Sequence, residues 1–248
     1  MKRIVIFLIL CFVIFSTVPA RAEIINFTDT VNYWSGWGNG SSDDSHDSIG
    51  NPNFTGGQAV VNHGLLTSLT FNRGPGFSSA LSAGDLFIDL GGNSNWDYVV
   101  DLTNWGIAGP GNTDPGAGNY GLYSVNLALN SSTGYILSGT DNNSGNAGGW
   151  HGYYIRDGHP VAANLTGQSI GQVGFTGWNS STSYTFTLPN GGLYLGDSGN
   201  FSIGWMPNCA NDVVYETLQY SATPEPATMS LLGLGLLGIF GLKRRRNK

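Results

Sequence analysis

Residues 85–102, DLFIDLGGNSNWDYVVDL, decide the fold class of this 248-residue chain. Apolar and polar side chains alternate on both sides of the turn sequence GGNSN, residues 91–95. This alternation is typical of β-strands, and a short Gly- and Asn-rich segment between two of them is typical of a hairpin. A register symmetric about Asn93 places Ile88 opposite Tyr98. The stretch therefore predicts an antiparallel hairpin.

This register gathers four aspartates on one face of the hairpin. Asp85 lies opposite Asp101, and Asp89 lies opposite Asp97. The other face is the expected core face, with Leu86, Ile88, Leu90, Trp96, Tyr98 and Val100. Opposed like charges destabilise a strand pair, so the acidic face needs either open solvent or a bound cation. We expect a solvated acidic face, and calcium, which takes carboxylate oxygens, is the candidate ion if the four aspartates bind a cation instead.

The same carboxyl pairs permit an enzymatic hypothesis. Two carboxyl groups about 5 Å apart suit a retaining glycosidase. Residues 23–222 contain only two glutamates, Glu23 and Glu216, and nothing in the pattern marks one acid as a proton donor. No catalytic residue is assigned, and a secreted polysaccharide-active enzyme using paired aspartates is the alternative to a non-enzymatic protein.

The hairpin belongs to a chain of short strands. Gly, Asn, Ser and Thr interrupt the sequence about every 8 to 12 residues, a spacing typical of all-β sandwiches and barrels. The expected strands are residues 24–34, 58–61, 65–71, 86–90, 96–102, 120–129, 134–137, 150–155, 170–178, 183–188, 200–205 and 212–220. So many short strands fit two packed antiparallel sheets. The prediction is an all-β fold, an antiparallel β-sandwich of the jelly-roll or lectin-like kind, in one domain over residues 23–222.

The N-terminus has the three parts of a secretory signal peptide. Lys2 and Arg3 precede an apolar run over residues 4–15, and Ala20-Arg21-Ala22 follows as a small-x-small cleavage site. We expect signal peptidase to remove residues 1–22 by cleaving before Glu23.

The predicted domain is much more acidic than the whole chain. The chain has a formal net charge of −6, but residues 23–222 hold only Arg73 and Arg156 against fifteen carboxyl groups, which gives −13. Such a domain repels phosphate backbones and anionic lipids. Nucleic acid is therefore excluded as a partner, whereas divalent cations and neutral polysaccharide remain. Cys209 is the only cysteine of this segment, so no intramolecular disulfide can form.

Three tryptophans lie in Gly-rich segments between the expected strands or at their ends. Trp34 and Trp37 belong to YWSGWGNG, and Trp150 belongs to GGWHGYY. Flat rings with a polar tip can stack on sugars, although aromatic residues in β-proteins also fill cores. They are the candidate sugar-contact residues for an extracellular polysaccharide.

The C-terminal tail has a three-part pattern. Pro224-Glu225-Pro226 precedes an apolar segment over residues 227–242, and Lys243, Arg244, Arg245 and Arg246 follow. Residues 223–248 resemble the PEP-CTERM sorting signal of Gram-negative bacteria. The resemblance implies a C-terminal transmembrane sorting helix that is inserted transiently in the inner membrane and recognised by an exosortase. Cleavage near the Pro-Glu-Pro motif would then release the protein to the cell surface or the exopolysaccharide matrix, while the basic stop cluster stays cytoplasmic.

The sequence before the tail carries a second likeness. FSIGWMPNCAND, residues 201–212, is similar to an ending of some PEP-CTERM surface proteins, to which no activity is attached. Together these features predict an exported, non-enzymatic β-domain that is a structural or carbohydrate-binding component of biofilm or exopolysaccharide.

Overall fold

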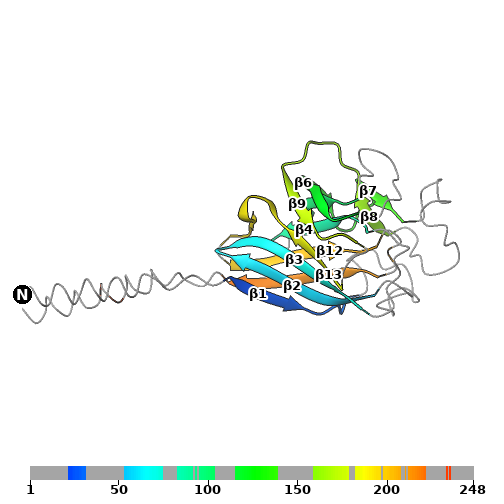
Figure 1. Ribbon diagram of the computed structural model, residues 1–248. Coiled ribbons are helices and arrows are strands. Elements are labelled where there is room, and N and C mark those ends of the chain that lie inside the picture. The colour runs from blue at the N-terminus through cyan, green and yellow to red at the C-terminus, as the bar shows by residue number, and fades with distance from the viewer. Residues whose placement is uncertain are drawn as a thin grey trace, which may run out of the picture. The chain divides into compact units, whose positions relative to one another are not determined.

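The structure is a computed structural model of the chain (Figure 1). It describes residues 22–31, 53–74, 83–91, 93, 95–103, 115–138, 159–178, 182–196, 198–207, 210, 212–221, 233 and 235. Residues 23–221 form one compact unit. Within the described ranges no helix combines the length and apolar character needed to cross a membrane.

The compact unit is built from antiparallel strands. Eleven of them share one sheet, in the order β1-β2-β3-β10-β9-β6-β5-β4-β12-β13, and β11 pairs with β3. Their bounds are β1 Glu23–Phe27, β2 Phe54–Asn62, β3 Leu65–Arg73, β4 Leu86–Leu90, β5 Asn95–Asp101, β6 Gly118–Ala128, β9 Gly171–Phe175, β10 Ser183–Thr187, β11 Leu193–Tyr194, β12 Ser198–Trp205 and β13 Val214–Ser221. A second sheet pairs β7 (Tyr135–Leu137) with β8 (Pro160–Ala163), and a 3-10 turn, Pro189–Gly191, precedes β11.

The large sheet nearly closes on itself. Its two end strands, β1 and β13, come into contact although they share no ladder (Figure 1). The predicted all-β, antiparallel fold is confirmed. The two separate sheets of a jelly-roll or lectin-like sandwich are not confirmed, because hydrogen bonds join eleven strands into a single sheet.

Aromatic rings fill the inside of this sheet. Trp205 is fully buried there, and its ring centroid lies 4.8 Å from that of Phe71 and 5.1 Å from that of Phe186. The rings of Phe54, Trp178 and Tyr184 pack around the same indole. Edge-to-face and tilted ring pairs add to the burial of apolar area, so this inner core stabilises the fold.

A second apolar cluster lies on the opposite face of β4, β5 and β6. Along β4, Leu86 and Ile88 join the inner core, whereas Phe87 joins the second cluster. The small β7–β8 sheet contributes Tyr135 and Val161 to the second cluster, so it packs on the outer face of the hairpin. We call this second cluster, with β7 and β8, the outer layer.

Most of the predicted strands overlap strands of the described residues, with differences at their ends. The expected strand over residues 24–34 is too long, because β1 ends at Phe27. β8 and β11 were not expected, since PVAA and LY are too short to show alternation. The expected strand over residues 150–155 lies outside the described residues.

Candidate functional site

The aspartate hairpin has the predicted register at its centre. Leu86, Phe87 and Ile88 of β4 pair with Val100, Val99 and Tyr98 of β5. The aspartates flank this three-pair ladder on both sides. The pattern of the sequence was therefore sufficient to place the acidic residues of the two strands close to one another.

The expectation that this face is open to solvent is wrong for three of the four aspartates. Asp85 is fully buried, Asp89 and Asp101 are also buried, and Asp97 is half-buried. The physical reason is the outer layer, which covers the hairpin face that carries Phe87 and Val99 between the aspartates. Sequence alternation cannot distinguish a face covered by solvent from one covered by a second layer.

Asp85 is held by four hydrogen bonds from two segments of the chain, residues 102–103 and Ala163. Its Oδ1 accepts from the Leu102 amide at 3.0 Å and from the Thr103 amide and Oγ1, each at 3.1 Å. Its Oδ2 accepts from the Ala163 amide of β8 at 3.0 Å. The Asp85 amide in turn donates to the Val161 carbonyl at 2.9 Å. Buried backbone amides need an acceptor, and the Asp85 carboxyl supplies it where the outer layer meets the hairpin.

The electrostatics of Asp85 follow from its burial. The pKa of Asp85 is raised to about 8, first by burial and second by the neighbouring Asp101 carboxylate, while the hydrogen bonds from Ala163 and Thr103 act in the opposite direction. Burial also raises the pKa of the Tyr123 hydroxyl, with smaller contributions from the charges of Asp101 and Asp85. The geometry and the raised pKa point to a carboxyl group with a structural role.

The turn end of the hairpin departs from the symmetric register. Asp97 Oδ2 accepts a hydrogen bond from the Leu90 amide at 2.7 Å, in place of a ladder bond. Trp96 was expected opposite Leu90 on the core face, but it packs in the outer layer instead. Its ring centroid lies 5.6 Å from that of Phe87 and 5.9 Å from that of Tyr215. A register shift between β5 and β6 lies at the same place, between Trp96 and Tyr98, and such irregularities redirect side chains.

Metal binding at the four aspartates stays a prediction. In the parts of the chain that the structure describes, no three His, Cys, Asp or Glu side chains are grouped so that they could hold a metal ion. Carboxyl oxygens of Asp85 and Asp97 already accept hydrogen bonds from backbone amides. Asp89 lies opposite Ser202 of the neighbouring strand β12 in the sheet register.

The two glutamates of the domain, which the sequence did not connect, lie at the seam between β1 and β13. Glu23 Oε2 accepts a hydrogen bond from the Ser221 amide at 3.2 Å. Glu216 accepts hydrogen bonds from the amide and side chain of Thr30, while partial burial raises its pKa. Both carboxyl groups thus join the first strand and its extension to the last strand, where no backbone ladder does.

Two residues of the segment 201–212, Trp205 and Asp212, have structural roles. Trp205 Nε1 donates to the Gly84 carbonyl at 3.0 Å from the centre of the inner core. The buried Asp212 carboxylate accepts a hydrogen bond from the Phe54 amide at the start of β2. Cys209 and Asn211 lie outside the described residues.

The remaining predicted site residues also lie outside the described ranges. These are the candidate sugar contacts Trp34, Trp37 and Trp150, the Pro224-Glu225-Pro226 motif, and the basic cluster of Lys243, Arg244, Arg245 and Arg246. Trp96, Trp178 and Trp205, the tryptophans that the structure describes, are fully buried.

Comparison with known proteins identifies the tail. Residues 222–246 match the family model of the PEP-CTERM protein-sorting motif, which confirms the resemblance of the tail and includes both the Pro-Glu-Pro motif and the basic cluster. No curated protein and no solved structure matches the chain. The chain therefore ends in a PEP-CTERM protein-sorting motif, a signal that implies an exported protein processed by an exosortase.

Proposed function

We propose that this protein is a non-enzymatic component of the bacterial cell surface or extracellular matrix, with a structural or carbohydrate-binding role in biofilm or exopolysaccharide. The observation that carries the proposal is the PEP-CTERM motif at residues 222–246, which begins directly after the last strand of a compact all-β unit. Signal peptidase acts at the N-terminus, and an exosortase acts at the tail.

The charge of the domain supports an extracellular, polysaccharide-rich setting. With −13 formal charges over residues 23–222, the domain stays soluble and repels anionic polymers. Neutral sugars are compatible with this field. We propose Trp34, Trp37 and Trp150 as their contacts, because flat indole rings with a polar tip can stack on sugar faces.

Two further proposals concern the aspartates. Calcium would raise the melting temperature if Asp85, Asp89, Asp97 and Asp101 held it, and a calcium titration that leaves the melting temperature unmoved would remove this proposal. Polysaccharide hydrolysis is the enzymatic alternative. The contacts of Asp85 and Asp97 favour a structural role, because a catalytic carboxyl group must reach its substrate.

The processing experiment compares the full precursor in a Gram-negative host with an exosortase and in the same host without the enzyme. We expect the exosortase host to release a protein whose intact mass lacks the residues beyond the Pro-Glu-Pro motif. A mature protein that still carries Arg244 to Arg246 would contradict the proposal.

The binding experiment uses the purified secreted protein and the producer's own exopolysaccharide. We expect retention in a pull-down and weaker retention when Trp34, Trp37 and Trp150 are changed together to alanine. Absence of retention would exclude the sugar-binding role. Release of reducing sugar that disappears in Asp89→Asn and Asp97→Asn variants would establish the enzymatic alternative instead.

A further inference from the structure

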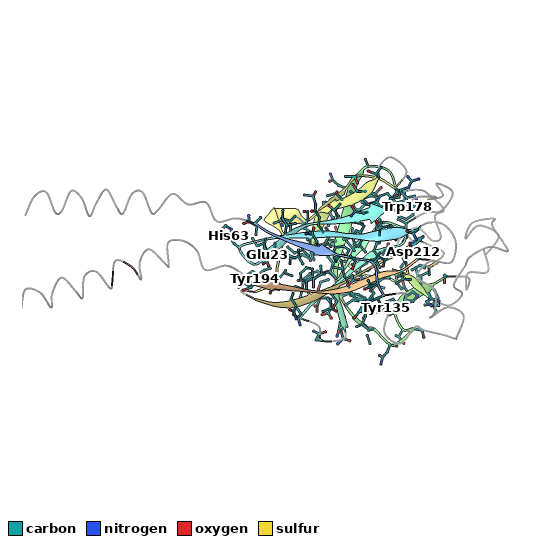
Figure 2. The ribbon with its side chains drawn as sticks, turned by 90° about the horizontal axis from the view of Figure 1, so that it is seen from below. Glu23, His63, Tyr135, Trp178, Tyr194 and Asp212 are labelled. Carbon is teal, nitrogen blue, oxygen red and sulfur yellow. The ribbon has the colours of Figure 1, made fainter. Side chains whose placement is uncertain are left out.

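Both chain ends of the compact unit lie at one end of its sheet. Glu23 begins β1, Ser221 ends β13, and the hydrogen bond between them joins the two positions. Figure 2 shows Glu23 at the same end of the unit as His63 and Tyr194. We call Glu23, His63, Tyr194 and Ser221 the terminal surface.

The terminal surface is tightly packed beneath its exposed side chains. The turn between β2 and β3 has left-handed backbone at His63 and Gly64, with φ of 52° and 73°. The Gly64 carbonyl accepts from the Leu195 amide at 2.7 Å, and a Cβ at Gly64 would lie 2.2 Å from the Gly196 carbonyl oxygen. The Tyr220 hydroxyl donates to the Leu195 carbonyl, so the segment after β11 connects the β2–β3 turn with β13.

The position of Ser221 fixes where the sorting tail begins. Ser221 pairs in register with Ser198 of β12 and donates its amide to Glu23. The matched motif starts at residue 222, and Pro224 is three residues beyond Ser221. Three extended residues span about 10 Å. An enzyme that binds the Pro-Glu-Pro motif must therefore approach the folded domain to within about 10 Å of Ser221, or break the last pairs of β13.

We propose that the terminal surface is the face of the domain that docks against the membrane-embedded exosortase during processing, an inference that rests on the proposed function. Tyr194 on this surface is 63% exposed and pairs with Leu65, the first residue of β3. The β2–β3 turn directly before Leu65 is fixed by the hydrogen bond from the Leu195 amide to the Gly64 carbonyl. Exposed tyrosine is enriched at protein interfaces. The partner that this surface contacts is the exosortase itself. The Pro-Glu-Pro motif begins only three residues beyond Ser221, so the enzyme that cuts the tail must come to this end of the sheet.

The test follows tail removal over time in the exosortase host, with the full precursor as substrate. Tyr194→Lys changes the terminal surface, and Asn72→Lys is the matched control, because Asn72 is exposed near the far end of β3. We expect tail removal to be severalfold slower for Tyr194→Lys and unchanged for Asn72→Lys. Insertion of a flexible Gly/Ser linker after Ser221 should restore the rate of Tyr194→Lys, because the domain then no longer needs to touch the enzyme.

Three controls keep the result decisive. The melting temperature of each variant shows whether the domain is intact, and Tyr194→Ala replaces Tyr194→Lys if the charged variant is destabilised. Equal rates for the Tyr194 and Asn72 variants, or a slow rate that the linker does not restore, would overturn the docking proposal. An unaltered precursor that keeps its tail in the exosortase host would instead overturn the proposed function.

Discussion

The Asp85 carboxyl, directly before β4, accepts a hydrogen bond at 3.0 Å from the amide of Ala163 in β8, 78 residues later in the chain. This bond links the large sheet to the small β7–β8 sheet. The same carboxyl group also accepts hydrogen bonds from the amides of Leu102 and Thr103. One side chain therefore holds the large sheet and the outer layer together.

Asp85→Ala should destabilise the protein strongly. It removes an acceptor of the Leu102, Thr103 and Ala163 amides, of which the Leu102 amide also donates to the Val100 carbonyl. Each buried amide left unsatisfied costs about 1–3 kcal/mol. We expect a loss of several kcal/mol in the free energy of unfolding, measured by urea denaturation. Ser124→Ala, at an exposed position of β6, is the control. A loss below about 1 kcal/mol in Asp85→Ala would contradict the role of Asp85 as a shared acceptor.

Stability should fall as the pH rises from about 4 to 8. The folded state holds a proton on Asp85 up to a pKa of about 8, whereas the unfolded state loses it near 3.8. Folding therefore binds a proton in this range, and raising the pH favours the unfolded state. Each unit of pKa difference is worth about 1.4 kcal/mol. The check is the melting temperature at pH 5 and pH 8.5, and Asp85→Asn, which cannot ionise, should flatten the difference.

Removal of the seam carboxyl groups should loosen β1 before it unfolds the domain. Glu216→Ala deletes the acceptor of the Thr30 amide and hydroxyl, and Glu23→Ala deletes the acceptor of Ser221. A typical hydrogen bond contributes about 1 kcal/mol. We expect faster hydrogen exchange of the amides of Thr30 and Ser221, with little change at the centre of β3. Uniform exchange changes across the sheet would argue against a local seam.

Substitution of Trp205 tests the inner core. Trp205→Ala should cost about 3–5 kcal/mol, as is usual for the removal of a buried indole. Trp205→Phe keeps most of the ring packing but loses the hydrogen bond to the Gly84 carbonyl, so a smaller loss is expected. Tyr194→Ala, an exposed aromatic change, should stay within about 0.5 kcal/mol. The three variants are compared in the same urea titrations.

Local pattern was enough to predict the secondary structure of much of the domain. Alternation and turn residues located the β4–β5 hairpin and the pairing of Ile88 with Tyr98, because strand pairing across a short turn is a local event. It could not locate β8, since PVAA shows no alternation. It also misplaced Trp96, because the register shift that accompanies it involves the partner strand β6.

The sequence was sufficient to identify the sorting tail but not the roles of the carboxyl groups. The sorting tail was readable because its three parts are contiguous in sequence, and the family match at residues 222–246 confirms it. The roles of the carboxyl groups were not readable, since the partners of Asp85 and Glu23 lie 78 and 198 residues away. Only a folded chain brings such donors and acceptors together.

The sequence by itself therefore determined an all-β chain with an acidic domain and an exosortase sorting tail, because strand periodicity, charge and the tail motif are local properties. The tertiary structure alone decided that the acidic face is buried, that eleven strands share one nearly closed sheet, and that Glu23 lies beside Ser221. These features depend on which distant surfaces cover each other, and that is set by the packing of the whole domain.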